Sequence, residues 1–338
     1  MTAPAQVSAA MRLAIEQGLR VKGSTYPNPP VGAVIVSADG EIVGVGATEP
    51  AGGPHAEVVA LQTAGERAAG GTAVVTLEPC NHHGRTPPCV DALMAANVAA
   101  VVYALADPNP VAAGGAARLH AAGVAVTAGV CAEDVAGGLL REWLHKERTG
   151  SPHVTWKFAA SVDGRSAAAD GSSQWITSEA ARADVHRRRA AADAIIVGTG
   201  TVFADDPNLT ARLPDGSLTE HQPLRVVVGK REIPPDSNVS RGDSPTMVLH
   251  THDPHEVIRA LSGRTDIILE GGPTIAGAFL RAGVVDRILA YVAPVLLGGP
   301  FGAVDDVGVV GISHALYWRY DGVERVGPDL LLSMVPTD

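Results

Sequence analysis

The segment PHAE at residues 54–57 opens an otherwise apolar run with an imidazole and a carboxylate two residues apart. Cys80 follows directly after a predicted strand, and Cys89 lies in the first turn of a predicted helix that a Pro-Pro pair opens. Amide N–H groups at a helix start lower the pKa of a thiol, and the thiolate is the form that binds metal. With His55, the two cysteines would give zinc three protein ligands and leave a fourth position for water, which is typical of catalytic sites.

Glu57 has the chemistry that a zinc-activated water needs from a partner. Zinc lowers the pKa of bound water to about 7, so hydroxide forms at neutral pH, and a nearby carboxylate can carry its proton to a leaving group. Residues i and i+2 do not share a helix face, but in the first turn both His55 and Glu57 can reach past the helix end. Zinc deaminases share the order H-x-E, then P-C-x-x-C, whereas a longer spacer separates Cys80 from Cys89 here. A buried thiol pair with a capping histidine, or a redox disulfide, is the alternative.

The composition is that of a globular protein of about two domains. The chain has 338 residues, of which 46% are hydrophobic and 4% aromatic, and its formal net charge is −10. Neither half has the basic excess expected of a dedicated nucleic-acid binder. No apolar run is long enough to cross a bilayer, and residues 1–20 lack the features of a signal peptide. With an odd count of three cysteines, these features predict a cytoplasmic protein without a disulfide framework.

Hydrophobic periodicity and turn signals predict alternating helices and strands in the first half. The expected order is helix 7–20, strands 31–36 and 41–46, helix 55–69, strand 73–77, helix 87–97, strand 99–105, helix 114–122 and strand 124–128. Pro54 is expected at the start of the second helix. A hairpin followed by alternating helices and strands implies a three-layer α/β/α sandwich around a mixed sheet.

The second half is expected to begin a new α/β series. A connecting helix over 131–150 ends at a turn-rich stretch, which predicts domains at 1–150 and 151–338. The expected strands of the second domain are 153–160, 194–198, 224–229, 246–250, 266–270 and 287–298, and the expected helices are 178–192 and 274–282.

Seven longer segments resemble one family across almost the whole chain. Three lie in the first half, TYPNPPVGAVIV (25–36), PHAEV (54–58) and TLEPCNHHGRTPPC (76–89), and four in the second, WKFAASVDGR (156–165), SQWITS (173–178), GTGTVFADDPNLTAR (198–212) and EGGPTIAGAF (270–279). Together they resemble the bifunctional deaminase–reductases of riboflavin biosynthesis, the RibD/RibG type. The resemblance implies a cytidine-deaminase-like domain followed by a dihydrofolate-reductase-like α/β domain.

The resemblance also implies the activity. The first domain would hydrolytically deaminate 2,5-diamino-6-(5-phospho-ribosylamino)pyrimidin-4-one, with one zinc per chain held by His55, Cys80 and Cys89 and with Glu57 as proton shuttle. The second domain would then reduce the ribosyl group with NADPH, which gives 5-amino-6-(5-phospho-ribitylamino)uracil. A homo-oligomer is expected, because the family often assembles, and the partner would be this small pyrimidine ribose phosphate rather than nucleic acid or membrane.

Further residues of the first half are expected to bind the substrate. Asn28 offers a donor and an acceptor between stiffening prolines, and an arginine fork such as that of Arg85 suits a phosphate. The expected set is Asn28, His82, His83, Arg85, Asp107 and Asn109. Structural turn roles are the alternative for Asn28, Asp107 and Asn109. Thr48 departs from the family, whose members usually carry a histidine seven residues before the zinc histidine.

In the second half the resemblance implies two sets of residues. NADPH would meet Ala159, Trp175, Thr201, Asp205, Gly272, Pro273, Thr274, Ile275, Ala276, Gly277 and Ala278. The substrate would meet Ser173, Arg189, Leu209, Arg212 and Glu270. No G-x-G-x-x-G follows the first strand of this half, so its layout resembles dihydrofolate reductase rather than a Rossmann domain.

The charged residues of this half also have chemistry of their own. Arg189 and Arg212 suit a sugar phosphate. Lys157, Asp205 and Glu270 could polarise the sugar carbonyl and supply a proton after hydride transfer. An exposed strand lysine is the alternative for Lys157, and ordinary packing is the alternative for Trp175. The sequence leaves the choice between NADPH and NADH open.

Three other functions stay open at the level of sequence. Only one half could be active, although both sets of motifs are complete. The chain could be a nucleic-acid base deaminase, which its acidic charge and its second domain oppose. A zinc-stabilised binding module without catalysis is the third, but it would not need Glu57 beside a metal ligand.

Overall fold

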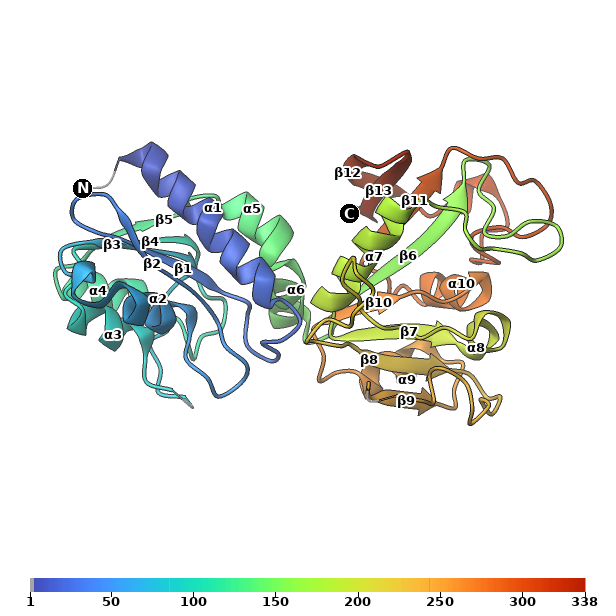
Figure 1. The fold of residues 1–338 in the computed structure, drawn as a ribbon, viewed down its shortest axis with the longest axis horizontal. Coiled ribbons are helices and arrows are strands. Elements are labelled where there is room, and N and C mark those ends of the chain that lie inside the picture. Colours follow the sequence, from blue (N-terminus) through green and yellow to red (C-terminus); the bar gives the residue numbers. More distant parts are fainter. Residues whose placement is uncertain (1–2, 85, 243, 338) are drawn as a thin grey trace. The chain divides into compact units, whose positions relative to one another are not determined.

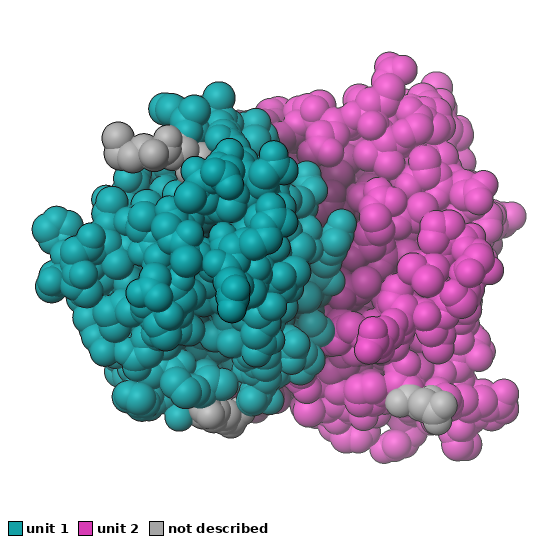
Figure 2. Space-filling view, turned by 60° about the vertical axis from the view of Figure 1, so that its left-hand side comes forward, with its two compact units in different colours: residues 1–151 teal, residues 152–338 magenta. Residues whose placement is uncertain are grey.

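The computed structural model describes residues 3–84, 86–242 and 244–337, and the chain forms two compact units. The first unit is Met1–Ser151 and the second is Pro152–Asp338 (Figures 1 and 2). In the described ranges no helix combines the length and apolar character that a bilayer span requires.

The first unit is built on a five-stranded mixed sheet, as predicted. The strand order is β2-β1-β3-β4-β5. β1 pairs antiparallel with β2 and β3, whereas β3, β4 and β5 run parallel. The strands are β1 (Gly32–Val36), β2 (Ile42–Ala47), β3 (Thr72–Leu77), β4 (Ala100–Leu105) and β5 (Ala125–Ala128).

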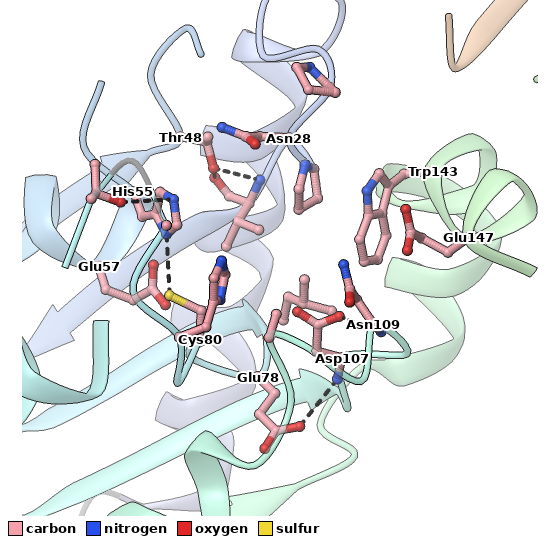
Figure 3. A pocket seen from close by; sticks show the side chains of 18 of the residues that line it. Asn28, Thr48, His55, Glu57, Glu78, Cys80, Asp107, Asn109, Trp143 and Glu147 are labelled. Carbon is pink, nitrogen blue, oxygen red and sulfur yellow. Dashed lines mark hydrogen bonds between the residues drawn. The ribbon is translucent and has the colours of Figure 1, made fainter. Parts of the chain in front are cut away.

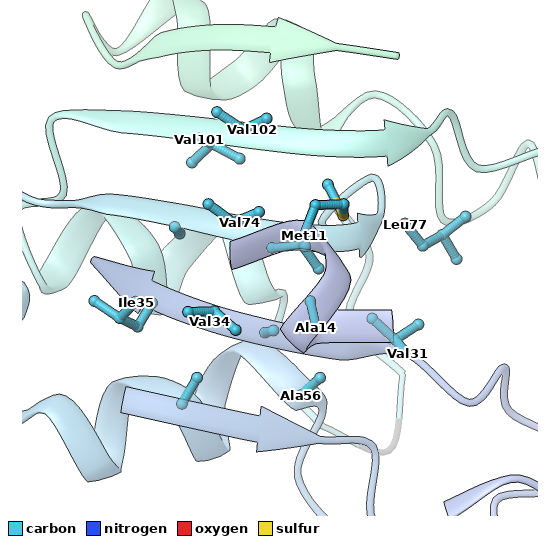
Figure 4. Close-up of a cluster of buried hydrophobic side chains, with 14 of the residues drawn as sticks. Met11, Ala14, Val31, Val34, Ile35, Ala56, Val74, Leu77, Val101 and Val102 are labelled. Atoms are coloured by element: carbon cyan, nitrogen blue, oxygen red, sulfur yellow. The ribbon is translucent and has the colours of Figure 1, made fainter. Parts of the chain in front are cut away.

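Helices cover both faces of this sheet and complete the predicted three-layer sandwich. Figure 1 shows α1 and α5 on one face and α2, α3 and α4 on the other. Met11 and Ala14 of α1 pack with buried valines of β1 and β3 in the core (Figure 4). The helices are α1 (Pro4–Val21), α2 (Ala56–Ala64), the 3₁₀ turn η1 (Gly65–Ala68), α3 (Cys89–Ala95), α4 (Gly115–Ala121), α5 (Ala132–Asp134), the π-helical turn η2 (Val135–Leu139) and α6 (Arg141–Thr149).

Three expectations for these helices are wrong in detail. The stretch 131–150 is not one helix, because a π-helical turn that contains two adjacent glycines separates α5 from α6, and glycine is a weak helix former. α2 ends at Ala64, where Gly65 turns to a φ of 56°. Pro54 lies outside α2, since His55 is its N-cap residue.

Gly115 links α4 to the loop that carries Cys80. A Cβ added at Gly115 would lie 1.8 Å from the carbonyl oxygen of Pro79, the residue before Cys80. We expect Gly115→Ala to cost about 1–3 kcal/mol of unfolding free energy, as overpacking does, and to weaken zinc retention. Urea unfolding and the zinc left after dialysis against a chelator would measure both effects. Gly138→Ala is the control, because an added Cβ there meets nothing within 4 Å; equal behaviour of the two variants would contradict the prediction.

The second unit is built on an eight-stranded sheet with the order β12-β13-β11-β6-β10-β7-β8-β9. The run from β11 to β9 is parallel, and β13 and β12 are added antiparallel at one side. The strands are β6 (His153–Ser161), β7 (Ala194–Gly198), β8 (Leu224–Val228), β9 (Thr246–Leu249), β10 (Asp266–Leu269), β11 (Arg287–Ala293), β12 (Trp318–Val326) and β13 (Asp329–Pro336). The helices are α7 (Glu179–Ala191), α8 (Thr199–Asp205), α9 (Pro254–Ala260), α10 (Pro273–Arg281) and the 3₁₀ turn η3 (Ile312–His314).

The parallel run fixes where ligands can bind in this unit. Because parallel strands end at the same edge of a sheet, the segments after β7, β8 and β10 gather there. Two sequence expectations differ: the strand predicted over 287–298 ends at Ala293, and the sequence patterns did not indicate α8, α9 or the hairpin β12–β13. β12 is an edge strand with mostly exposed side chains, so it lacks the alternating pattern of a half-buried strand.

Candidate active sites

His55, Cys80 and Cys89 come together at the ends of three elements of the first unit. His55 Nδ1 lies 3.5 Å from Cys80 Sγ and 3.3 Å from Cys89 Sγ. The three ligand atoms all lie within 4.8 Å of one another. Two sulfurs and one imidazole nitrogen are donors that suit zinc, so the residues present fit the predicted metal.

The three ligand residues share protons unequally. A hydrogen bond with Cys80 raises the pKa of Cys89 and the pKa of His55, whereas Cys80 is shifted toward the thiolate. A hydrogen bond with Cys89 lowers the pKa of Cys80, although burial opposes this effect. The backbone N–H of Cys89 also donates to Cys80 Sγ at 3.4 Å, as expected at a helix start. Glu57 is 4% exposed, and burial raises the pKa of its carboxyl to about 7. A buried carboxyl beside three ligand atoms can both accept and release a proton.

A pocket of about 390 Å³ opens onto this cluster. Figure 3 shows His55, Glu57 and Cys80 on one side of the pocket and Asp107, Asn109, Trp143 and Glu147 on the other. The predicted residues Asn28, His82, Asp107 and Asn109 all line the pocket. His83 is not among the lining residues, and Arg85 lies outside the described residues.

Two predicted residues have polar atoms that suit a ligand. His82 Nδ1 is buried, and in the described ranges it has no hydrogen-bond partner. Burial raises the pKa of Asp107, whose Oδ1 accepts the N–H of Asn109 at 2.9 Å. A buried polar atom without a partner is costly, so a bound polar ring would satisfy His82.

The sequence motifs did not identify Glu78, Trp143 or Glu147, which also line the pocket. Glu78 accepts backbone N–H groups of Asp107, Gly114 and Ala116 at 2.9–3.2 Å. It therefore orders the segment that carries Asp107, and its place next to the Pro-Cys pair was the available signal. Trp143 and Glu147 come from α6, and no motif marks them.

Thr48 also lines the pocket, but its hydroxyl is engaged with the backbone. Its Oγ1 lies 3.1 Å from the N–H of Val31 and 3.4 Å from the carbonyl oxygen of Val31. Thr48 is 3% exposed. The Thr48 hydroxyl is therefore already hydrogen-bonded to the backbone of Val31.

A partly buried ion cluster forms the second candidate site. Arg189 donates from Nε and Nη2 to the two oxygens of Glu270 at 2.7 and 2.8 Å. Lys157 Nζ lies 3.6 Å from the same carboxylate. Burial disfavours ionised Glu270, but Arg189 and then Lys157 outweigh it and lower the pKa of the carboxyl to about 2. Burial lowers the pKa of Lys157, against the attraction of Glu270.

Glu270→Gln should lower the free energy of unfolding of the second unit by about 2–3 kcal/mol, because it leaves two partly buried cations without their counter-ion. The side chains of both cations are 17% exposed, so solvent screens part of the loss. Urea unfolding would measure the loss. Asp306→Asn is the control: it removes an exposed pair with Arg281, 2.8 Å long, and should cost less than about 1 kcal/mol. Similar losses in the two variants would contradict the counter-ion role of Glu270.

The other predicted residues of this unit lie around the cluster or apart from it. Arg189 Nη1 also donates to the carbonyl oxygen of Thr210 at 3.2 Å, between the predicted Leu209 and Arg212. Arg212 itself donates to the carbonyl oxygen of Gly216 at 2.9 Å. Asp205 is exposed at the end of α8 and, in the described part of the chain, forms no hydrogen bond or ion pair.

The predicted cofactor residues occupy four places in this unit. Ala159 lies in β6, next to Tyr291 in the register with β11. Trp175 precedes α7, as does Ser173, which was predicted to meet the substrate. Trp175 is 69% exposed, and the Arg182 guanidinium lies 4.6 Å from its ring centre. Thr201 lies in the first turn of α8, and residues 272–278 form the start of α10 with its N-cap.

The hydroxyl of Tyr291 is a further polar group beside the ion cluster, and no sequence motif indicated it. Tyr291 is 1% exposed, and its hydroxyl bonds to Asp184 and accepts from Arg188 Nε at 2.8 Å. Lys157 Nζ lies 5.9 Å from the centre of the Tyr291 ring. In the sequence, Tyr291 lies within a strand of mostly apolar residues. Nothing there distinguishes it from an ordinary core side chain.

Comparisons with known proteins assign a family to each unit. The family described as "Cytidine and deoxycytidylate deaminase zinc-binding region" matches residues 4–105, and the family "RibD C-terminal domain" matches residues 152–332. The chain is 70% identical to riboflavin biosynthesis protein RibD of Mycobacterium tuberculosis over 97% of each chain. It is 42% identical to RibD of Escherichia coli over 96% of this chain and 98% of the relative.

Solved structures extend the similarity to the whole fold. Acinetobacter baumannii RibD superposes with a TM-score of 0.87 at 39% identity and covers 99% of each chain. A Thermotoga maritima protein described as a diaminohydroxyphosphoribosylaminopyrimidine deaminase/5-amino-6-(5-phosphoribosylamino)uracil reductase superposes with a TM-score of 0.88 at 30% identity, over 98% of this chain and 99% of the other. The chain therefore belongs to the RibD family of bifunctional riboflavin-biosynthesis enzymes, with a zinc-binding deaminase domain followed by a reductase domain.

Proposed function

We propose that the first domain, residues 1–150, deaminates 2,5-diamino-6-(5-phospho-ribosylamino)pyrimidin-4-one and that the second, residues 151–338, reduces the product. Water replaces one ring amino group, which leaves as ammonia. Hydride and a proton then open the ribosyl ring to ribityl, which gives 5-amino-6-(5-phospho-ribitylamino)uracil. The observation that carries the proposal is the buried carboxyl of Glu57 in one pocket with the ligand cluster of His55 and Cys80.

Each residue of the first pocket has a role in the proposed deamination. Zinc held by His55, Cys80 and Cys89 would supply Lewis-acid activation of the attacking water. Glu57 would accept the proton of that water and return it to the departing amino nitrogen. Asn28, His82, Asp107 and Asn109 would hold the pyrimidine edge, and His83 and Arg85 would meet the phosphate end.

The ion cluster of Lys157, Arg189 and Glu270 has the corresponding role in the proposed reduction. NADPH would supply the hydride. Lys157 would donate a proton to the sugar oxygen as the ring opens, and Glu270 would hold the ammonium in place. Arg189 would orient Glu270, and Ser173, Leu209 and Arg212 would complete the substrate site. Asp205 is a second candidate proton donor.

The residues present also fit the proposed cofactor. Gly198 is the last residue of the parallel strand β7, and Gly272 follows the parallel strand β10 by three residues. A Cβ added at either glycine would meet its nearest neighbour only at 3.8 Å, so a phosphate can approach the backbone N–H groups. Ala159, Trp175, Thr201, Asp205 and residues 272–278 would line this cofactor site.

An assay of the diaminopyrimidine phosphate with and without NADPH tests the whole proposal. Ammonia release should need no NADPH, and NADPH oxidation should follow only after ammonia has been released. Ammonia without oxidation would mean that only the first domain is active. Absence of both reactions would contradict the proposed substrate.

We also propose that the protein forms a homo-oligomer through its second unit. The segment 296–323 exposes several large apolar side chains, including Leu296 at 75%, Val310 at 94% and Ile312 at 86%. Exposed apolar patches often mark interaction sites, and the neighbouring edge strand β12 offers free pairing groups. Light scattering at micromolar concentration would measure the mass; a monomer would contradict this proposal.

A further inference from the structure

Arg231 is an exposed arginine near the expected cofactor residues that the proposed function leaves without a role. It follows β8 by three residues, and its guanidinium lies 4.6 Å from the centre of the Phe203 ring in α8. A Cβ added at Gly200 would lie 3.6 Å from Arg231 Nη2. The guanidinium therefore lies against α8, close to Gly200 in the first turn, with one face held by an aromatic ring.

This position is at the edge of the sheet where the cofactor residues gather. A Cβ added at Gly229 would lie 2.6 Å from Thr199 Oγ1, so the segment after β8 touches the start of α8. A Cβ added at Gly272 would lie 3.8 Å from Thr201 Oγ1, so α8 in turn lies beside the start of α10. The segments after three parallel strands thus meet, as in the ligand sites of open α/β sheets.

The donors of Arg231 are available to a ligand. In the ranges that the structure describes, its guanidinium forms no hydrogen bond or ion pair. Lys230 beside it is exposed and equally unpaired there, and the one acidic neighbour in sequence, Glu232, is exposed. A guanidinium stacked on a ring keeps its edge N–H groups free, and these match the oxygens of a phosphate.

We propose that Arg231, assisted by the charge of Lys230, binds the 2′-phosphate on the adenosine ribose of NADPH and makes the reductase select NADPH over NADH. The two cofactors differ only in that phosphate. The inference rests on the proposed reductase function, which requires a nicotinamide cofactor at this edge of the sheet. Phe203 positions the arginine, because stacking restricts the guanidinium before the ligand arrives.

Calorimetry with adenosine fragments tests the inference without any turnover. The full-length protein is titrated with adenosine 2′,5′-bisphosphate and, separately, with 5′-AMP, which lacks the 2′-phosphate. The wild type should bind the bisphosphate at least about tenfold more tightly, as a charge-assisted contact allows. Arg231→Gln should remove most of this preference and leave 5′-AMP binding unchanged. In steady state, the same variant should raise the KM for NADPH and leave the KM for NADH unchanged.

Matched variants separate the proposed contact from general effects of charge or folding. Arg241→Gln removes an arginine of 64% exposure from the loop before β9 and should keep the full preference. Phe203→Leu keeps the arginine but removes the ring, so it should reduce the preference by less than Arg231→Gln does. If Arg231→Gln fails to fold, Arg231→Lys, which keeps a point charge, should retain part of the preference.

Two results would overturn the inference. One is a wild type that binds the two fragments equally while still oxidising a nicotinamide cofactor. The other is a folded Arg231→Gln that keeps the wild-type preference. A wild type that binds neither fragment and oxidises neither cofactor would instead refute the reductase function itself.

Discussion

Glu57→Gln should abolish ammonia release from the diaminopyrimidine phosphate while the protein keeps its zinc. Glutamine has the shape of glutamate, so the ligand cluster should stay intact, but an amide does not accept and return a proton. Glu57 is buried in the pocket with His55 and Cys80. Loss of a general acid–base group costs about 10²–10⁴-fold in rate. Ammonia release and metal analysis would measure the two properties.

Two further variants define what this result means. Glu66→Gln changes an exposed carboxylate of η1 and should release ammonia at the wild-type rate. His55→Ala should lose zinc and ammonia release together, because it removes a ligand. Full activity of Glu57→Gln would contradict the proton-transfer role, and loss of its zinc would show a structural role instead.

The zinc donors could be predicted from sequence because each lies at the boundary of a local element. His55 is the N-cap residue of α2, and Cys89 is the first residue of α3. Helix-start signals, including the Pro-Pro pair before Cys89, therefore predicted that both side chains lie at helix starts. The opposite wall of the pocket had no such signal. Trp143 and Glu147 reach the pocket from α6, beyond the zinc-binding region that ends at residue 105, and only tertiary packing brings them there.

Elements with weak local patterns were the ones that sequence missed or misplaced. The predicted helix over 131–150 has helical composition at both ends, but the glycines in its middle permit the π-helical turn. α8 and α9 have seven residues each, too few to show a period of 3.6 residues. The family resemblance indicated Lys157, Arg189 and Glu270 one by one. It did not indicate that the two cations pair with the carboxylate, because that pairing requires β6, α7 and the segment after β10 to meet in space.

Lys157→Met should stop the reduction while ammonia release continues. Methionine retains most of the apolar stem but removes the ammonium that lies 3.6 Å from Glu270. Arg189 still holds both oxygens of that carboxylate, so this variant should unfold at nearly the wild-type urea concentration, unlike Glu270→Gln. Removal of the proton donor should slow NADPH oxidation by about 10²–10⁴-fold. The deaminated product, supplied directly, would show the effect on the second reaction alone.

Ammonia release reports on the first domain and NADPH oxidation on the second, so each reaction can be lost without the other. The candidate zinc ligands, Glu57 and the pocket lie in the first unit. Lys157 lies in β6 of the second unit, so ammonia release should be unchanged in Lys157→Met. Loss of both reactions would contradict separate sites. Unchanged NADPH oxidation would transfer the proton-donor role to Asp205, the second candidate, which lies exposed at the end of α8. Asp205→Asn, measured beside Lys157→Met, then identifies the donor, because the variant that lacks the donor loses the reduction without losing ammonia release.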